Sequence, residues 1–453
     1  MLALLAAKAA AGLSPRLRRG GGTALPGLIA ERLDPGILAA LGRELGGAVL
    51  VTGTNGKTTT ARLLAGMLAA AGRAAVHNRA GSNLTRGMAS ALAANADRRG
   101  RPRDPAALVL METDEATLPA AVRALRPRAV AFTNLFRDQL DRYGEVEGVA
   151  AHWRESLALL PSEATLVLNA DDPSVADLAS DWPGAVHWFG LAGTGATDDA
   201  PGPADARWCR ACGGSYRYTQ RYATHLGLWR CSGCARARPS PETTAAEIAL
   251  APAGARFTVP GLGAVAMPLE GLYNVANALA AVALARVLGL PAEAIREGLA
   301  GARPAFGRGQ VISHGGRRLR LLLCKNPAGA TEALRLLSSS AGQAQIAFVL
   351  NDRFADGRDV SWIWDVDFER LADRVARCWV AGERAEDAAL RLRYAGWPAP
   401  AAVVHSPAAL LDAIAASAGE DGEITVLVTY TALLDILRPL GERALSPGGA
   451  PAG

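Results

Sequence analysis

Residues 48–60 read AVLVTGTNGKTTT, and this stretch decides the fold. The apolar run at 48–51 predicts a buried strand, and the alanine- and leucine-rich run at 61–71 predicts a helix. Between them lies a glycine loop that ends in Lys57 and Thr58. Strand, glycine loop and helix in this order are typical of a phosphate-binding loop, where backbone N–H groups and a helix N-terminus face an anion.

The loop is a variant of the strict motif G-x-x-x-x-G-K-[ST], because Gly53 and Gly56 are only three positions apart. In such a loop the lysine supplies charge to the β- and γ-phosphates, and the threonine hydroxyl binds Mg²⁺. The sequence therefore predicts that the chain binds a nucleoside triphosphate with Mg²⁺. The candidate nucleotide-binding residues here are Gly53, Thr54, Asn55, Gly56, Lys57, Thr58 and Thr59.

The 453-residue length predicts about two to four domains. The net charge of +5 comes from arginines scattered along the chain, which does not favour a nucleic-acid-binding protein. Near the N-terminus, Lys8 interrupts the apolar start and further arginines follow it, the reverse of a secretory signal. We therefore expect a cytoplasmic protein, with residues 1–44 as a helical arm and a candidate for contact with the inner face of the plasma membrane.

Short apolar runs alternate with helical patterns through the first part of the chain. This alternation predicts an α/β fold with a mostly parallel, doubly wound sheet. Polar residues follow the apolar runs, among them Glu112, Asn134, Asp171 and Asp172. Because ligands of such sheets bind beyond the carboxyl ends of the strands, we expect one site shared among these loops.

Four cysteines, Cys209, Cys212, Cys231 and Cys234, have the spacing C-x₂-C-x₁₈-C-x₂-C. This spacing predicts a zinc ribbon, in which each Cys-x-x-Cys turn gives two thiolates to one tetrahedral ion. A pair of redox dithiols is the alternative. Flanking proline, glycine and aspartate stretches indicate an insertion over about 204–238, and a metal can replace the hydrophobic core of so small a unit.

A proline- and glycine-containing stretch, RPAFGRGQ at 303–310, predicts a boundary between a central domain at 45–305 and a C-terminal α/β domain at 306–453. Two polar stretches follow strands of that second domain, at 324–329 and 351–359, and SWIWD at 361–365 is either functional or a packed turn. Asn274 and Asn277 lie on one face near the start of a helix, where they suit either ligand binding or a helix cap.

Several motifs in order resemble the Mur ligase family, the ATP-dependent ligases of peptidoglycan synthesis. They are TGTNGKTTT, a glutamate at a strand end, TN at 133–134, LNADDP at 168–173, GLYNVANA at 271–278 and the GR pair at 307–308. The four-cysteine insertion and the stretch NDRFADGRDVSWIWD at 351–365 resemble the MurT-type subunits of lipid II isoglutaminyl synthase. Together the matching motifs extend over about residues 45–440.

The resemblance implies a Mur-ligase-like central domain with an inserted four-cysteine zinc ribbon, followed by a Rossmann-like C-terminal domain. It implies ATP-dependent amidation of the α-carboxylate of D-glutamate in lipid II, giving D-isoglutamine through an acyl phosphate. Ammonia would come from a GatD-like glutaminase subunit in a heterodimer. Neither Cys324 nor Cys378 lies in a nucleophile elbow, which agrees with a separate glutaminase. ATP, Mg²⁺ and Zn²⁺ are the cofactors that it implies.

The resemblance also assigns roles to individual residues. Lys57 and Glu112 are catalytic, and Thr58, Glu112 and Thr85 are candidate Mg²⁺ ligands. The further nucleotide contacts are Asn274 at the adenine, Arg308 at the phosphates, and Lys325 and Asn326 from the C-terminal domain. Either Asp356 or Asp359, with a slight preference for Asp356, would complete the Cys–His pair of the glutaminase, by orienting the histidine and stabilising its cation.

Two departures from the usual Mur ligase pattern fit ammonia as the nucleophile. Gln139 stands where amino-acid-adding Mur ligases usually carry histidine, and their amino-acid-binding motif is not recognisable in the C-terminal domain. Only about 45 residues precede the phosphate-binding loop, too few for the usual UDP-binding domain, which fits a lipid-linked substrate. The alternatives are a Mur- or folylpolyglutamate-type ligase that adds a free amino acid, and a zinc-ribbon NTPase acting on nucleic acid.

Overall fold

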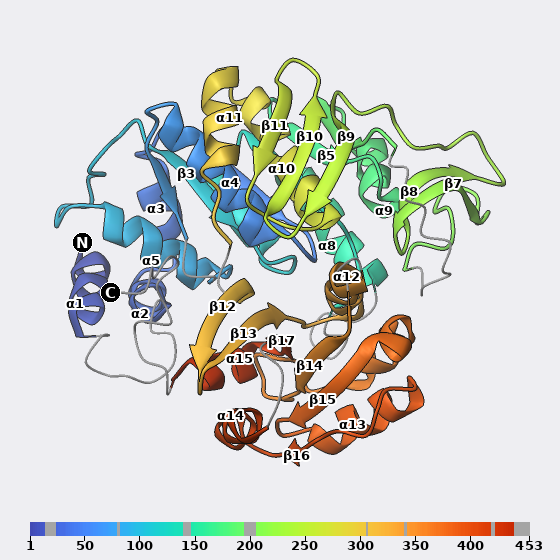
Figure 1. Ribbon diagram of the computed structural model, residues 1–453. Helices are drawn as coiled ribbons and strands as arrows, with labels where there is room; N and C mark the ends of the chain where they lie inside the picture. The colour runs from blue at the N-terminus through green and yellow to red at the C-terminus, as the bar shows by residue number, and fades with distance from the viewer. Residues whose placement is uncertain are drawn as a thin grey trace. The chain divides into compact units, whose positions relative to one another are not determined.

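The computed structural model describes residues 1–13, 24–78, 82–138, 146–193, 205–304, 307–338, 342–417 and 422–438 (Figure 1). Gln139, the arginines at positions 16, 18 and 19 and the side chain of Arg308 lie outside these described parts. The described residues form two compact units. Unit 1 takes its residues from Met1–Leu135, Val146–Asp199 and Ala204–Ala302, and unit 2 takes its residues mainly from Phe136–Glu145 and Arg303–Gly453.

Unit 1 contains a nine-stranded sheet with the order β11-β10-β9-β6-β5-β4-β1-β3-β2. Neighbouring strands from β9 to β2 in this order are parallel, which confirms the predicted α/β sheet. The parallel strands are β1 (Ala48–Thr52), β2 (Ala75–His77), β3 (Leu108–Glu112), β4 (Ala129–Phe132), β5 (Thr165–Asn169), β6 (Val186–Leu191) and β9 (Thr243–Ala251). Two antiparallel strands, β10 (Gly254–Val259) and β11 (Gly263–Met267), extend the sheet beyond β9.

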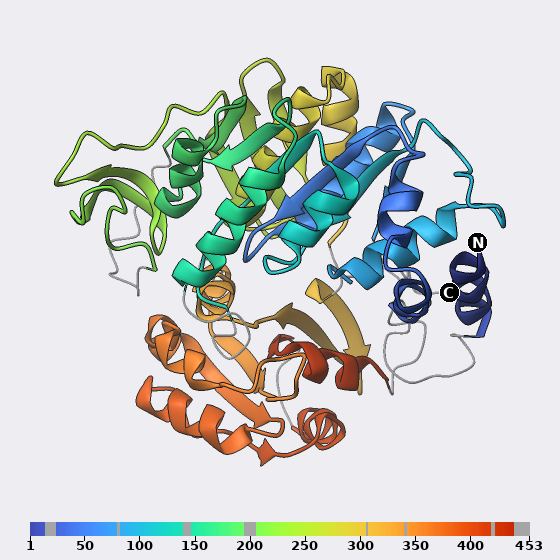
Figure 2. The same ribbon diagram turned by 180° about the vertical axis from the view of Figure 1, so that it is seen from behind.

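Helices cover both faces of this sheet (Figures 1 and 2). The helices α4 (Lys57–Ala70), α10 (Leu272–Val287) and α11 (Ala292–Ala300) pack together and contribute to one hydrophobic core with the strands. The remaining helices between the strands are α5 (Thr85–Asn95), α6 (Leu118–Leu125), α8 (Val146–Leu159), α9 (Pro173–Ala176) and the 3₁₀ helix η2 (Asp177–Asp181). Since α4 starts directly after the glycine loop, this core holds the loop's helix in place.

Three helices precede β1: α1 (Leu2–Leu13), α2 (Leu25–Leu33) and α3 (Ile37–Gly42). These helices lie within residues 1–44, which the sequence analysis interprets as a helical arm, and α1 packs against α2 and α5. The Lys8 ammonium donates to the carbonyl oxygens of Ala93 and Ala96 at the end of α5, at 2.9 and 2.6 Å. A cation at a helix C-terminus satisfies carbonyls that have no partner within the helix. Within the described part of the chain, no helix is both long and apolar enough to cross a membrane.

A hairpin is inserted between β6 and β9, where the sequence predicted the ribbon. Its strands are β7 (Tyr216–Ala223) and β8 (Leu226–Cys231), and they form a separate two-stranded sheet. The four cysteines flank this hairpin, two before β7 and two at and after the end of β8. The hairpin is therefore an insertion into unit 1.

Unit 2 contains a six-stranded sheet with the order β12-β13-β17-β14-β15-β16. All neighbours are parallel except the edge pair β12–β13. The strands are β12 (Arg308–His314), β13 (Arg317–Leu323), β14 (Ala344–Val349), β15 (Val375–Ala381), β16 (Val403–Val404) and β17 (Glu423–Val428). The helices are α12 (Pro327–Ser338), α13 (Ala385–Tyr394), α14 (Pro407–Ala416), α15 (Tyr430–Leu437) and the 3₁₀ helices η3 (Ser361–Asp365) and η4 (Phe368–Arg374).

Candidate functional site

The glycine loop joins β1 to α4 as the sequence predicted, and two of its residues require glycine. Gly53 and Gly56 have φ values of +130° and +89°. A Cβ atom on Gly53 would lie 2.1 Å from the Thr133 Oγ1, and one on Gly56 would lie 2.0 Å from the Asn277 Oδ1. Gly56 is the N-cap residue of α4, and no side chain caps this helix. The first N–H groups of α4 thus lack a side-chain cap and suit an anion.

Lys57 lies at the start of α4 and is almost completely buried. Its ammonium donates to the carbonyl oxygens of Gly53 and Thr54 and forms an ion pair with the Glu115 Oε1 at 3.1 Å. Glu115 lies beyond the end of β3 and is itself buried. The sequence pointed to the polar stretch after β3 but gave Glu115 no role, because the pairing joins residues 58 positions apart.

Thr58 and Glu112 meet as predicted. The Thr58 hydroxyl lies 2.9 Å from each Glu112 carboxylate oxygen. Asn78 fixes the backbone of Glu112 from both sides, since its Oδ1 accepts from the Glu112 N–H and its Nδ2 donates to the Glu112 carbonyl. A hydroxyl and a carboxylate are oxygen ligands of the kind that Mg²⁺ prefers. These two side chains therefore fit a magnesium ion beside the loop.

The loop is also held by the segment after β4, a support that the sequence did not reveal. The Thr133 hydroxyl donates to the Asn55 carbonyl at 2.7 Å. The Asn134 side chain accepts from the Asn55 N–H at 2.8 Å and donates to its carbonyl at 3.1 Å. The backbone N–H of Thr54 donates to the Asn134 carbonyl. These bonds fix the loop's backbone before any ligand binds.

Asn274 and Asn277 lie on the first turns of α10 and are both buried. The Asn277 side chain donates to the Asn274 Oδ1 at 3.3 Å, and Asn274 donates to the Glu270 carbonyl. A side chain at Gly56 would clash with the Asn277 side chain, so the start of α10 packs against the glycine loop. Neither asparagine caps α10.

Thr85, the third predicted Mg²⁺ ligand, makes its hydrogen bond to a residue other than Thr58 and Glu112. It is the first residue of α5 and hydrogen-bonds Glu31, whose pKa is raised by burial. Among the contacts of the described residues, none joins Thr85 to Thr58 or Glu112. Its predicted role at Mg²⁺ stays a prediction.

In unit 2, the turn between β13 and α12 carries the two predicted residues Lys325 and Asn326. The Lys325 ammonium lies 2.5 Å from the Asp138 Oδ2, and the other oxygen of Asp138 is buried without a hydrogen bond. The Asn326 Oδ1 accepts from the Gly329 N–H at 2.8 Å, so Asn326 caps the start of α12.

Asp356 and Asp359 differ in surroundings. Asp356 is buried, and its carboxylate accepts from both the N–H and the hydroxyl of Thr431 on α15. Burial raises the pKa of Asp356, although its hydrogen bonds with Thr431 oppose the shift. Asp359 is exposed, and one of its oxygens accepts from the Ser361 N–H at the start of η3.

The cysteines Cys324 and Cys378 are buried in unit 2. Burial raises the pKa of the Cys324 thiol to about 12 and that of the Cys378 thiol to about 11. Because the thiolate is the nucleophilic form, neither thiol is suited to covalent catalysis at neutral pH.

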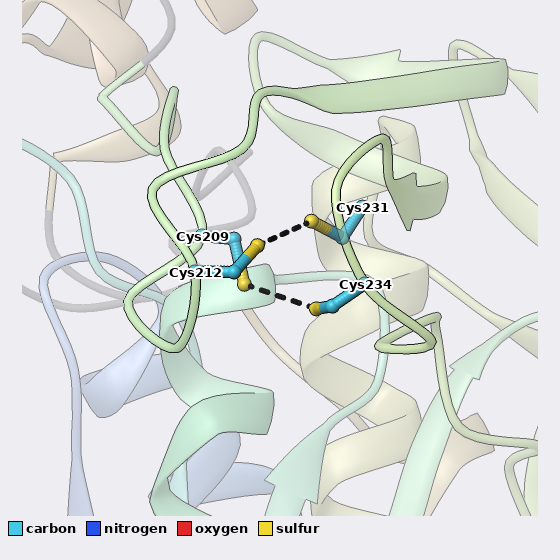
Figure 3. A group of neighbouring side chains, drawn as sticks. All are labelled: Cys209, Cys212, Cys231 and Cys234. Carbon is cyan, nitrogen blue, oxygen red and sulfur yellow. Dashed lines mark hydrogen bonds between the residues drawn. The ribbon is translucent and has the colours of Figure 1, made fainter.

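The four cysteines of the insertion come together in one cluster (Figure 3). Their sulfur atoms all lie within 4.8 Å of one another, with Cys212 Sγ 3.4 Å from Cys231 Sγ and Cys209 Sγ 3.7 Å from Cys234 Sγ. A tetrahedral zinc ion with Zn–S bonds of about 2.3 Å separates its sulfurs by about 3.8 Å. Backbone N–H groups of Gly214 and Gly233 point at two of the sulfurs. The donor set and its spacing therefore fit zinc.

Family models and known proteins match both parts of the chain. Residues 51–200 match the model "Mur ligase middle domain", and residues 323–433 match "MurT ligase C-terminal". The MurT subunit of lipid II isoglutaminyl synthase (glutamine-hydrolyzing) from Streptococcus pneumoniae is 32% identical over 94% of each chain. The subunit of the same name from Staphylococcus aureus is 31% identical over 97% of each chain.

Solved structures show the same fold at lower identity. A pseudomurein peptide ligase type C from Methanothermus fervidus has a TM-score of 0.66 at 20% identity, covering 88% of this chain and 78% of that one. MurF from Acinetobacter baumannii has a TM-score of 0.64 at 19% identity, covering 92% and 81%. The fold is thus that of the Mur ligases, and with the near-full-length relatives above, the chain belongs to the MurT family of Mur ligases.

Proposed function

We propose that the chain is the ATP-dependent ligase subunit of a lipid II isoglutaminyl synthase. It amidates the α-carboxylate of D-glutamate in lipid II and gives D-isoglutamine. The observation that carries this proposal is the near-full-length similarity to subunits of that name. The contacts of Lys57 and Thr58 beside the glycine loop support it. The relatives' activity requires both a nucleotide site and a nitrogen source.

The reaction follows from the residues around the loop. A substrate carboxylate oxygen attacks the γ-phosphorus of ATP, ADP leaves, and an acyl phosphate forms. Ammonia then attacks the acyl carbon, loses a proton and displaces inorganic phosphate. The loop N–H groups and Lys57 hold the phosphates and offset the charge that develops during transfer. Mg²⁺, held by Thr58 and Glu112, would add further neutralisation of the phosphate oxygens.

Lys57 has to change partners when ATP binds. In the structure its ammonium pairs with Glu115 and with two loop carbonyls. A phosphate oxygen is a competing anion, so the triphosphate replaces part of this pairing. The buried ion pair holds Lys57 near the loop until then, because an unpaired ammonium would be costly to bury.

The remaining nucleotide contacts are part of the same proposal. Asn274 is assigned to the adenine and Arg308 to the phosphates, and Lys325 and Asn326 are assigned further contacts with the nucleotide. Thr85 is retained as an additional Mg²⁺ ligand. The resemblance to Mur ligases supports these roles.

We propose a GatD-like glutaminase as the partner that supplies ammonia. The relatives are named as subunits of a glutamine-hydrolyzing enzyme, and the buried thiols Cys324 and Cys378 are poor nucleophiles. Asp359 is the better candidate to serve a partner's histidine, because it is exposed while both oxygens of Asp356 are engaged by Thr431. Asp359→Asn should abolish glutaminase activity of the reconstituted complex, and full activity of this variant in an intact complex would reject the role.

We further propose that the cysteine cluster holds Zn²⁺, that unit 2 is Rossmann-like, and that the N-terminal arm contacts the membrane. The spacing of the sulfurs supports the first proposal, and the parallel sheet of unit 2 supports the second. Exposed Leu2 and Leu5 on α1 support the third. Metal analysis of the purified chain, and its co-sedimentation with anionic vesicles, test the first and the third.

One experiment tests the function as a whole. The chain is purified with and without a co-expressed glutaminase and is supplied with ATP, lipid II and either ammonium or glutamine. We expect ammonium alone to suffice for the isolated chain and glutamine to suffice only for the complex. Replacement of a hydroxyl by an amino group lowers the mass of the lipid by about one unit. Addition of a free amino acid instead would identify the alternative Mur- or folylpolyglutamate-type ligase.

A further inference from the structure

The inserted hairpin β7–β8 is anchored to the loop that follows β5 by buried polar contacts. His225, in the turn of the hairpin, lies 3.4 Å from the Asp172 carboxylate, measured from Nε2 to Oδ2, and both side chains are completely buried. The Trp229 indole donates to the Ala170 carbonyl at 2.9 Å, and the Gly227 N–H donates to the Asp171 carbonyl at 2.9 Å. The hairpin therefore covers the stretch that ends the β5 strand.

Asp172 joins this hairpin to a second loop. Its Oδ2, which faces His225, also accepts from the Leu135 N–H at 2.8 Å. Its Oδ1 accepts from the N–H groups of Ser174 and Val175 and so caps α9. A fully buried carboxylate is tolerated only when hydrogen bonds and opposite charge compensate it, so its partners fix its position closely.

Leu135 ends the segment that holds the phosphate-binding loop. Thr133 and Asn134, directly before it, make the bonds to Asn55 and Thr54 described above. The Asn169 side chain adds a 2.8 Å bond to the Thr133 carbonyl from the end of β5. A continuous path of contacts thus runs from His225 through Asp172 to the backbone of the glycine loop.

We propose that the hairpin positions the phosphate-binding loop for nucleotide, and that Asp172 is the positioning residue that couples the two. The inference rests on one part of the proposed function, namely that the loop binds nucleotide. Asp172 touches no reacting atom in this scheme. It holds Leu135, and through the segment Thr133–Leu135 it sets where the N–H groups of Thr54 and Asn55 lie.

Other anchors of the hairpin provide the contrast that makes this testable. Arg210 and Arg236, beside the cysteines, form ion pairs with Asp177 on η2. The Tyr222 hydroxyl donates to the Leu191 carbonyl at the end of β6. These three contacts fasten the insertion to unit 1 at points other than the Thr133–Leu135 segment. Loss of one of them should loosen the hairpin without moving the loop.

The test measures binding of MgATP to full-length variants by calorimetry, with metal content and thermal unfolding recorded for each. His225→Phe keeps a ring in the buried site but cannot pair with Asp172, and Asp172→Asn removes the charge. We expect each to weaken MgATP binding about tenfold, because the loss of this buried contact lets Asp172 and the Leu135 backbone shift. His225→Gln, which retains an N–H donor, should restore most of the affinity. In turnover assays the KM for ATP should rise more than kcat falls.

Arg236→Gln and Tyr222→Phe are the matched controls, and we expect them to bind MgATP within about twofold of the wild type. Wild-type affinity in a folded His225→Phe variant with its metal retained would overturn the inference. Equal weakening in the controls would also overturn it, since general loosening would then explain the loss. If His225→Phe does not fold, the MgATP affinity of Asp172→Asn is compared with that of Arg236→Gln instead. Failure of the wild type itself to bind MgATP would instead refute the proposed function.

Discussion

Two strand–turn–helix units in this chain carry a lysine close to the start of the helix and use it differently. In unit 1, β1 leads through a glycine loop to Lys57 and the uncapped helix α4. In unit 2, β13 leads through a short turn with Lys325 to α12, whose first turn is capped by the Asn326 side chain. The first helix start therefore offers N–H groups to an anion, whereas the second has already satisfied one of them.

The two lysines also differ in their surroundings. Lys57 is buried, and Glu115 and loop carbonyls hold it beside the helix start. Lys325 is partly exposed and pairs with Asp138. The comparison teaches that a lysine after a strand does not by itself make a phosphate-binding loop. Positive-φ glycines and a helix without a side-chain cap are needed as well, and of these two turns only the first combines them.

The largest expected effect is the loss of Lys57. Lys57→Met removes the charge that we propose stabilises the transferred phosphoryl group, and we expect ATP-dependent turnover to fall by about 10²–10³-fold. Lys325→Met is the matched variant in the other turn, and its effect should be smaller by at least about tenfold. Steady-state ammonium-dependent amidation measures both. Equal losses in the two variants would break the distinction between the turns.

Gly56→Ala should have the next largest effect. The new Cβ would need a left-handed backbone and would lie 2.0 Å from the Asn277 Oδ1. Gly72→Ala, at the other end of α4, has a φ of +67° but open space around the new atom. We expect Gly72→Ala to cost about 1–2 kcal/mol of unfolding free energy, and Gly56→Ala to cost more and also to weaken MgATP binding. Denaturant unfolding and calorimetry measure the two effects, and normal nucleotide affinity in Gly56→Ala would count against the loop's role.

Asn326→Ala probes the capped turn. Removal of the cap should lower the stability of unit 2 by about 0.5–2 kcal/mol. Asn326→Asp keeps an acceptor for the Gly329 N–H and should retain most of that stability. Chemical denaturation of the three proteins provides the measurement. A full loss in Asn326→Asp would mean that something other than the cap is being removed.

The smallest effect concerns pH and the contact between Asp356 and α15 in unit 2. Asp356 accepts from the Thr431 N–H at α15, and burial raises its pKa above the ordinary value. Between these two pKa values the folded state binds more protons than the unfolded state. The contribution of Asp356 to stability is therefore full below its ordinary pKa and is lost as pH rises through the raised pKa. Asp356→Asn should flatten this part of the stability profile, and an unchanged profile would contradict the prediction.

Local patterns predicted the glycine loop, the four-cysteine insertion and the parallel sheet, whereas the placing of Thr58 beside Glu112 came from the resemblance to Mur ligases. The predictions from local patterns depend on residue spacing or on the rule that strand ends meet at one edge. The strands β6, β11 and β12 were not predicted. The stretch at 303–310 was predicted as a boundary, and the main part of unit 2 starts at Arg303, but the strand β12, which begins at Arg308 and pairs with β13, was not foreseen there. Gly309, with a φ of +83°, lies where the register of this strand pair shifts, a position typical of glycine at a β-bulge.

The supporting contacts of the site could not be predicted either. Glu115 at Lys57, Asn134 at Asn55 and Asp172 at Leu135 and His225 join segments that are far apart in the sequence. No periodicity or spacing rule links such positions, since the fold alone decides which loops meet. The sequence thus indicated candidate residues for the chemistry, and the structure adds the residues that hold Lys57 and the glycine loop in place.

The position of the insertion has a consequence for the way in which the chain connects β6 to β9. The strands β6 and β9 are parallel neighbours, so a tight turn cannot join them, and a crossover of about a dozen or more residues is required. In most α/β proteins a helix makes that crossover. Here the cysteine-bearing hairpin stands in its place, so it is a connector of the sheet as well as an appendage. A variant that lacks the whole segment between β6 and β9 would therefore need another crossover of about a dozen or more residues to reach the start of β9.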